Sequence, residues 1–391
     1  MTAQGLLPTT ATQGLLVVIA AFWVATLACG GPEFTPALVR LGAQVRASGE
    51  PWRMWSYAFL HGSWAHVFMN GFALWRIGQP LERLLGTQRF VTLYSLTALA
   101  GGVATSFTSA GLSVGSSGAL WGLLGAEAIL VLGPRPTLPP PLARRARGAV
   151  AQNLILNVVI SFLPGINAAA HFAGGAIGML LMLTVLAPGL PTWGDDGVRP
   201  GEPPDWLQPL AWLTGSALLA SAAIAVVTGR PWALAAPGPT VEAQLAAGRI
   251  AVPAQLAPRT PDPAKDTVVF GNLLSDPAVV LASGIPLEPA ELEEAREHPE
   301  LLLAQPEATR TIDPPTSMRR DGRTLATARY VHKTGDLWES ALVLMPDGDH
   351  GAPAEMLRID AVLHARASQA WHGLATEIAA SATPNNGAGR H

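Results

Sequence analysis

The sequence predicts an all-α polytopic membrane protein: a compact bundle of six helices, one extra transmembrane helix standing apart, and then a small soluble α+β module. About half of the 391 residues are apolar (49%) and only 14% are charged, whereas soluble globular chains carry about 25% charged residues. The charges are also uneven, with 11 basic and 8 acidic residues in positions 1–228 and 14 and 20 in positions 229–391. The net charge of −3 argues against a nucleic-acid-binding protein.

Seven apolar runs approach the roughly 17–25 residues that a membrane-spanning helix needs. They lie near Ala11–Cys29, Ser63–Gly78, Phe90–Ala110, Ser117–Gly133, Ala149–Leu163, Ala168–Ala187 and Trp206–Thr228. Several are short and carry polar residues, as expected for helices that line a cavity inside a bundle. The predicted divisions are a helical core at 1–187, a Pro- and Gly-rich linker at 188–205, the seventh span at 206–228 and the extension at 229–391.

Arginine placement predicts how the spans are oriented. The loops after spans two and four are flanked or occupied by Arg76, Arg83, Arg89, Arg135, Arg144, Arg145 and Arg147, whereas the loops 108–116 and 164–167 hold no basic residue. Arginine-bearing loops are cytoplasmic by the positive-inside rule, although the first long loop also holds three arginines. We therefore expect a cytoplasmic N-terminus and an extracytoplasmic extension. Only two of the 25 basic residues are lysine, a bias that indicates a GC-rich genome and hence a bacterial inner (plasma) membrane.

The extension, residues 229–391, is expected to be partly disordered, mainly in its Pro/Ala/Gly-rich stretch up to about Pro263. Capping and alternation patterns predict a small α+β module after that stretch. Its predicted elements are a helix at Glu288–His298, a hairpin of Thr324–His332 with Leu337–Met345, and a helical stretch over Ala354–Ala380.

The second span carries His66 and Asn70, which are four residues apart and therefore share one helical face. Strongly polar groups inside a membrane are costly and usually functional. These two side chains could instead link neighbouring helices by hydrogen bonds, and this span alone leaves both interpretations open.

Span four opens with Gly115-Ser116-Ser117-Gly118, and span six carries His171 near its outer end. Glycines form one face of each helix: Gly118, Gly122 and Gly125 on span four, and Gly174 and Gly178 on span six. Because glycine faces allow helix backbones to approach closely, Ser117 and His171 are expected near hydrogen-bond distance. Taken singly, Ser117 could bond within its own helix and His171 could be a buried histidine bonded to a carbonyl.

Together these side chains supply what acyl transfer requires. A serine hydroxyl needs an adjacent base, and His171 can serve Ser117 in that role. A developing oxyanion needs donors, which the Asn70 amide, the His66 ring and the Ser117 N–H can provide. No acidic residue lies at this depth to orient His171, since Glu127 comes more than two turns after Ser117. The sequence therefore predicts a Ser–His dyad rather than a triad.

Five separated motifs follow in order: Trp52-Arg53, His61…His66…Asn70, Glu82…Gly86, Gly115-Ser116-Ser117-Gly118 and His171…Gly174…Gly178. Over about residues 11–187 this combination resembles the rhomboid family of intramembrane serine proteases. The resemblance implies a rhomboid-like catalytic core with Ser117 as nucleophile and His171 as general base. It places His66, Asn70 and Gly115 at the oxyanion, and His61, Trp52, Arg53, Trp121, Gly174 and Gly178 around the site. Many relatives have a tyrosine at the position of Trp121.

The implied function is an intramembrane serine endopeptidase that cleaves transmembrane or juxtamembrane segments of membrane proteins in the bilayer. No metal, cofactor or nucleic acid is implied, and Asp347–His350 is typical of a turn rather than a metal site. A non-catalytic relative that binds and retains transmembrane clients is the alternative. A transporter or channel is less favoured, because the sequence has no evident inverted repeat and no intramembrane carboxylate pair.

Overall fold

The computed structural model divides into two compact units, which are described separately. The helical unit comprises Met1–Glu33 and Ala37–Pro231, and the sheet unit comprises Phe34–Pro36 and Trp232–His391. The structure describes residues 10–46, 48–108, 111–135, 137–194, 197–245, 247–256, 267–303, 309–320, 323–345 and 355–384.

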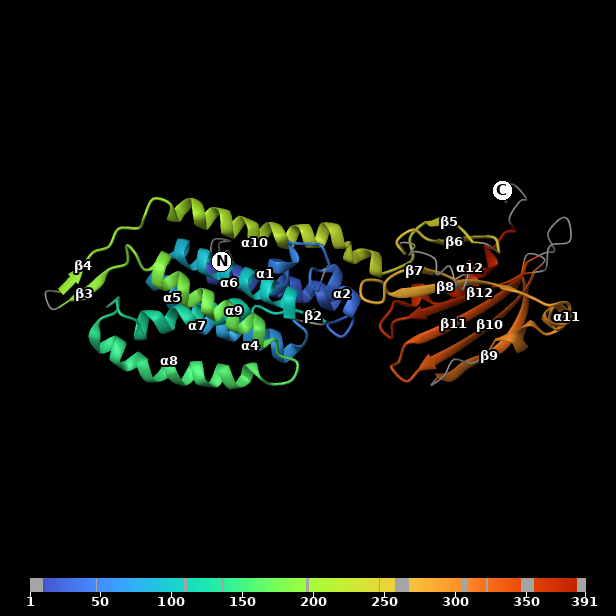
Figure 1. Cartoon of the computed structure of the whole chain (residues 1–391), viewed down its shortest axis with the longest axis horizontal. Helices are drawn as coiled ribbons and strands as arrows, with labels where there is room; N and C mark the ends of the chain where they lie inside the picture. The colour runs from blue at the N-terminus through green and yellow to red at the C-terminus, as the bar shows by residue number, and fades with distance from the viewer. Residues whose placement is uncertain are drawn as a thin grey trace, which may run out of the picture. The chain divides into compact units, whose positions relative to one another are not determined.

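The helical unit contains seven helical segments that overlap the seven predicted runs (Figure 1). They are α1 (Ala11–Ala28), α4 (Trp64–Ala73) continuing through a π-helical turn into α5 (Gln79–Leu85), α6 (Thr87–Thr108), α7 (Ser117–Leu132), α8 (Pro140–Ser161), α9 (Ala168–Leu181) with a π-helical end, and α10 (Leu207–Gly229). Within the described residues, four helices are long and apolar enough to cross a membrane: Ala11–Ala28, Thr87–Thr108, Ala168–Leu186 and Leu207–Leu234. Helix α7 is a shorter apolar helix, so the count of seven spans stays a prediction.

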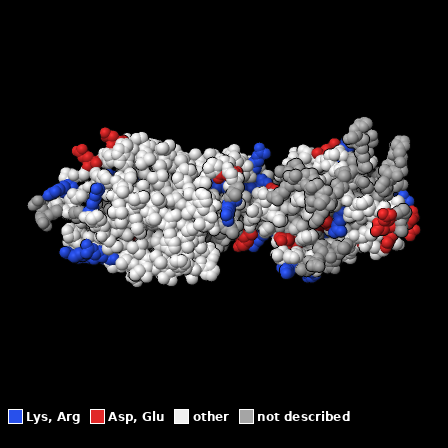
Figure 2. Space-filling model, in the orientation of Figure 1, with Lys and Arg blue, Asp and Glu red and all other residues white. Residues whose placement is uncertain are grey.

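The helices differ in how many of their residues are buried, which separates inner helices from outer ones. Twelve of the 16 residues of α7 are buried, whereas α8 buries only Val150 and Ser161. On the face seen in Figure 2, the middle of this unit is free of visible charge, and the Lys, Arg, Asp and Glu side chains gather toward its ends. That distribution is typical of a protein whose middle lies in the apolar layer of a membrane.

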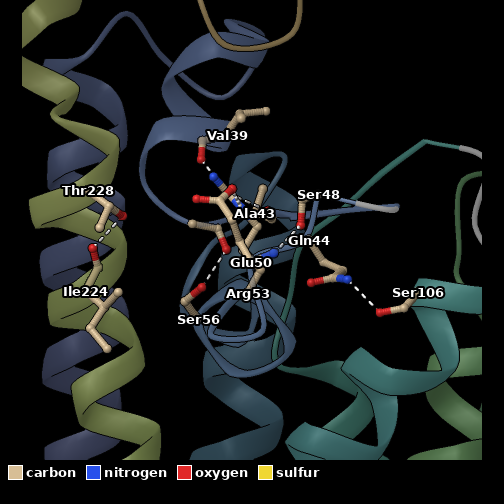
Figure 3. A network of polar contacts seen from close by, with 11 residues as sticks. Val39, Ala43, Gln44, Ser48, Glu50, Arg53, Ser56, Ser106, Ile224 and Thr228 are labelled. Carbon is tan, nitrogen blue, oxygen red and sulfur yellow. Dashed lines mark hydrogen bonds and ion pairs between the residues drawn. The ribbon is translucent and has the colours of Figure 1, made fainter.

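The first loop is built around the buried side chain of Arg53 (Figure 3). This loop contains α2 (Thr35–Arg40), β1 (Gln44–Val45), α3 (Arg53–Ser56) and a 3₁₀ turn at Tyr57–Phe59, and β1 pairs with β2 (Leu112–Ser113). The Arg53 guanidinium bonds to the Val39 and Ala43 carbonyls at 2.6 and 2.9 Å and pairs with Glu50 at 2.6 Å. One side chain thus satisfies backbone acceptors that helices and strands leave free.

The seventh helix does not stand apart, and that expectation is wrong. Helix α10 packs against α6 and α3 because small residues on it allow close backbone contact. A Cβ added to Gly229 would lie 1.8 Å from the Arg40 carbonyl oxygen, and one added to Gly42 would lie 2.6 Å from Ala225 Cβ. The Arg40 guanidinium also donates to the Gly229 carbonyl at 3.0 Å.

The sheet unit is one six-stranded antiparallel sheet with an apolar core on each face. In spatial order its strands are β7 (Thr267–Phe270), β8 (Ala278–Pro286), β12 (Glu355–Leu363), β11 (Leu337–Leu344), β10 (Arg323–His332) and β9 (Thr309–Arg320). One core includes α12 (Leu374–Ala380) and the hairpin of β5 (Thr240–Gln244) and β6 (Arg249–Pro253), and the other includes α11 (Pro289–Glu297). The predicted β10–β11 hairpin and the helix α11, capped by Glu288, are confirmed.

Two expectations for the extension need correction. In the predicted helical stretch Ala354–Ala380, Leu374–Ala380 is helix, but Glu355–Leu363 is the strand β12. Its fully buried residues alternate with a period of two: Leu357, Ile359, Ala361 and Leu363. The Pro/Ala/Gly-rich stretch contains the β5–β6 hairpin, while residues 257–266 lie outside the described residues. Asp347–His350 also lies outside them. The linker carries a short hairpin of β3 (Thr192–Gly194) and β4 (Gly197–Arg199).

Candidate active site

Helix α4 presents His66 and Asn70 from its first two turns. Ser63 caps this helix by accepting a hydrogen bond from the His66 N–H at 3.1 Å. The His66 ring accepts a long bond from the Gly62 N–H at Nδ1 (3.5 Å), which favours the neutral ring with its proton on Nε2. Asn70 is 6% exposed, and its Nδ2 has no hydrogen-bond partner among the described residues. Helix α4 therefore offers two preorganised N–H donors.

Gly115 lies in the loop before α7, close to the His66 and Asn70 donors. Its φ of +121° is a conformation that L side chains rarely adopt. A Cβ added there would lie 2.6 Å from His66 Nε2 and 3.6 Å from Asn70 Nδ2. The Gly115 N–H donates to the Tyr57 carbonyl at 3.0 Å, which ties this loop to the first loop. Only glycine fits here.

Helices α7 and α9 meet along their glycine faces, as the glycine spacing predicts. A Cβ added to Gly174 would lie 2.0 Å from the Gly118 carbonyl oxygen, and one added to Gly178 would lie 2.2 Å from that of Gly122. This approach brings together side chains that are 54 positions apart in the sequence. Ser117 Oγ, at the first residue of α7, lies 2.8 Å from His171 Nε2 on α9.

Two further contacts lie around His171, one at the start of its helix and one at its ring. The Asn167 side chain caps α9 by accepting from the Ala170 N–H at 3.1 Å, and its amide donates to Thr105 Oγ1 at 2.9 Å. The Trp121 ring lies 5.9 Å from the His171 ring, centroid to centroid, at an interplanar angle of 30°. Tryptophan therefore occupies the face of the histidine ring at this position.

Ser161, the last residue of α8, completes the surroundings of His171, and the sequence alone does not predict its place there. Its Oγ lies 2.7 Å from His171 Nδ1, and its side chain is 1% exposed. The one sequence signal for Ser161 is that it is a polar residue near the end of an apolar span. A single serine there has no periodic partner, so the spacing alone gives no reason to choose it.

The other motif residues lie outside the Ser117–His171 pair. His61 is 1% exposed, and its ring stands edge-on to that of His66 at 4.9 Å. Trp52 and Arg53 lie in the first loop, where Arg53 bonds to backbone carbonyls of that loop. Within the described residues, no group of three or more His, Cys, Asp or Glu side chains could hold a metal ion.

Glu82 lies away from Ser117 and joins three helices. Its carboxylate accepts hydrogen bonds from the Ala11 and Thr12 N–H groups at 2.8 and 2.9 Å, at the start of α1. It also accepts from the hydroxyl of Thr87 at 3.0 Å, at the start of α6. A carboxylate at a helix N-terminus satisfies N–H groups that have no partner within the helix.

The half-buried Ser117 thus bonds to His171 beside the unpartnered Asn70 amide, in a bundle of apolar helices typical of a multi-pass membrane protein. The Rhomboid domain family model matches residues 48–188. RHOMBOID-like protein 5 of Arabidopsis thaliana is 35% identical over 164 residues, which cover 40% of this chain and 52% of that protein. Rhomboid protease GluP of Bacillus subtilis (strain 168) is 32% identical over 178 residues, or 44% of this chain and 33% of that protein.

Putative rhomboid protease YdcA of Bacillus subtilis (strain 168) is 30% identical over 138 residues, covering 34% of this chain and 67% of that protein. The chain belongs to the rhomboid family. The match to RHOMBOID-like protein 5 spans about half of that protein, and the match to GluP about a third. Rhomboid-family membership and the apolar helices make this chain a multi-pass membrane protein whose family includes intramembrane proteases.

Proposed function

We propose that this protein is an intramembrane serine endopeptidase that uses Ser117 and His171. The observation that carries this proposal is the 2.8 Å separation between Ser117 Oγ and His171 Nε2 at the contact of α7 with α9. That distance lies within hydrogen-bond reach, as a nucleophile and its general base require.

In the proposed reaction, Ser117 Oγ bonds to the scissile carbonyl carbon while its proton passes to His171 Nε2. The carbonyl π electrons move onto oxygen. When the tetrahedral intermediate collapses, the C–N bond breaks and His171 Nε2 gives that proton to the leaving nitrogen. Water then attacks the acyl-enzyme ester, loses a proton to His171 Nε2, and the ester C–O bond breaks as Ser117 Oγ recovers the proton.

The negative oxygen of the intermediate has three candidate donors. The Asn70 amide and His66 Nε2–H lie beside the Gly115 loop, and the Ser117 N–H stands at the start of α7. Buried donors fixed before the reaction stabilise developing charge without reorganising. Asn70 suits this role because its Nδ2 is buried and has no partner within the described part of the chain.

The proposed substrates are transmembrane or juxtamembrane segments of membrane proteins. The carbonyls of a helical segment are already hydrogen-bonded, so a segment must unwind locally before Ser117 can attack it. Helix-destabilising residues near the scissile bond are the expected cleavage context. Arginine placement supports a cytoplasmic N-terminus and an extracytoplasmic sheet unit, and the scarcity of lysine supports a bacterial inner membrane.

The second candidate function is binding and retention of transmembrane clients without cleavage. It depends on the same membrane helices but needs neither Ser117 nor His171. Client capture that survives loss of both side chains, with no product from the parent protein, would favour it.

Reporter cleavage tests the proposed function. The purified full-length protein in liposomes is mixed with a transmembrane reporter, and products are identified by gel and mass spectrometry. The parent should cleave, whereas Ser117→Ala and His171→Ala should not. Ser221→Ala is the matched control, since Ser221 is a buried helical serine that bonds to a carbonyl of its own helix at 2.6 Å. Equal cleavage by Ser117→Ala and the parent would overturn the proposal.

A further inference from the structure

We propose that Ser161 is a positioning residue that keeps the proton of the neutral His171 ring on Nδ1 and aims Nε2 at Ser117. This inference rests on the proposed function and adds a third residue to its site. Ser161 Oγ lies 2.7 Å from His171 Nδ1, on the side of the ring opposite to Ser117.

The direction of this hydrogen bond follows from the donors that Ser161 has. A serine hydroxyl has one proton and two acceptor lone pairs. Ser161 Oγ also lies 2.8 Å from the carbonyl oxygen of Asn157, to which it donates that proton. Ser161 is then left to accept from His171, so Nδ1 must carry the ring proton. Nε2 is consequently unprotonated and able to take the proton of Ser117.

The two hydrogen bonds of Ser161, to His171 and to the Asn157 carbonyl, also stabilise the protonated His171 ring that forms during the reaction. When His171 Nε2 gains a proton, the Nδ1–H still donates to Ser161 Oγ and Ser161 still donates to the Asn157 carbonyl. No proton leaves Nδ1. Ser161 is also the last residue of α8, so the partial negative charge of that helix end lies beside the ring. A neutral hydroxyl thus supplies the orientation that a carboxylate supplies in a triad.

Ser161 lies on the face of α8 that packs toward α7, together with Val150 and the partly buried Leu154. Helix α8 buries only Val150 and Ser161, while neighbouring apolar side chains on it are exposed, including Ile155 at 67% and Val159 at 61%. Ser161 is therefore a polar residue at the end of the packed face of α8, while the opposite face is exposed. Its contact with His171 gives this buried hydroxyl a partner beyond its own helix.

The test combines a spectroscopic readout with kinetics on full-length protein in detergent micelles. Nitrogen-15 spectra of histidine-labelled protein report which ring nitrogen is protonated, and comparison with His171→Ala identifies the His171 signals. The parent and Ser161→Thr, which retains a hydroxyl, should show His171 protonated at Nδ1. Ser161→Ala should lose this preference for Nδ1. Ser221→Ala should match the parent in both readouts.

In reporter cleavage, Ser161→Ala should lower kcat roughly 10- to 100-fold, the loss expected for one hydrogen bond to a group that becomes charged. KM should stay near the parent value, and Ser161→Thr should restore most of kcat. Parent-like kcat and an unchanged tautomer in folded Ser161→Ala would overturn the inference. If the parent itself cleaves nothing, the proposed function fails, while the tautomer spectra still decide the role of Ser161.

Discussion

Gly174 of α9 packs directly on the Gly118 carbonyl of α7, so that a Cβ added to Gly174 would lie 2.0 Å from that oxygen. Real Cβ atoms do not approach a backbone oxygen so closely, which means that any larger residue must push these two helices apart. The same two helices carry Ser117 and His171. The contact between the glycine faces therefore sets the distance between these two side chains.

Gly174→Ala should consequently lower reporter cleavage by at least about tenfold, because small misplacements of reacting groups are costly. Overpacking should also lower stability by about 1–3 kcal/mol. Gly14→Ala on α1 is the control, since an added Cβ there meets nothing within 4 Å. Cleavage rate and thermal unfolding of both variants in detergent check the prediction. Parent-like cleavage by Gly174→Ala would show that the glycine contact does not set the distance.

Gly115→Ala should abolish cleavage, because the added Cβ meets His66 Nε2 and the residue is held at positive φ. Gly49→Ala separates these two causes. Gly49 also has a positive φ (+71°), but an added Cβ there lies in open space. Only the Gly115 variant should lose activity while it remains folded by circular dichroism. Comparable loss in both variants would attribute the effect to backbone strain rather than to crowding of the donors.

The glycine faces and the Ser–His pair could be predicted because their residues recur at helical spacing and are chemically distinctive. Ser161 could not, since its contact with His171 depends on how the turn between α8 and α9 folds, and no repeat marks it. Strand β12 was mistaken for helix because Leu357, Val362 and Trp371 match a helical spacing by chance. The alternation of Leu357, Ile359 and Ala361 is the signal that the burial pattern bears out.

The packing of α10 could not be predicted from the sequence either. An apolar run of this length predicts a membrane span but not its neighbours. Gly229 and Ala225 are small enough for close contact, yet small residues also occur where no helix packs. The structure places them against Arg40 and Gly42 in the first loop.

Arg53→Ala should lower stability by about 2–4 kcal/mol, because it leaves the Val39 and Ala43 carbonyls without their buried donor (Figure 3). Arg46→Ala, at an exposed position of the same loop, should change stability little. The melting temperatures of both variants in detergent test this difference. Equal melting temperatures would mean that Arg53 does not hold the first loop together.

Glu339 should make the sheet unit less stable as pH rises. Burial raises the pKa of the Glu339 carboxyl, and hydrogen bonds from the Gly373 and Ala375 N–H groups at 2.7 and 3.5 Å offset part of that shift. At pH values between the ordinary glutamate pKa of about 4.3 and the raised pKa of Glu339, the folded state binds more protons than the unfolded chain. Stability therefore falls as pH rises through this window.

Glu339→Gln should remove that pH dependence, because the amide does not titrate. Hydrogen-exchange protection of β11 in full-length protein, compared between parent and variant at each pH, measures the difference. Glu294→Gln, at an exposed helix position, should behave like the parent. If the difference in β11 protection between the parent and Glu339→Gln does not change with pH, Glu339 is not the source of the pH dependence.

The most direct test of the account is whether Ser117 is a nucleophile activated by His171. Full-length protein in detergent is treated with a fluorophosphonate, and peptide mass spectrometry locates the adduct. We expect an adduct at Ser117 in the parent, none at that position in Ser117→Ala, and much slower labelling in His171→Ala. Folded parent protein that carries no adduct at Ser117, or labelling of His171→Ala at the parent rate, would contradict the account.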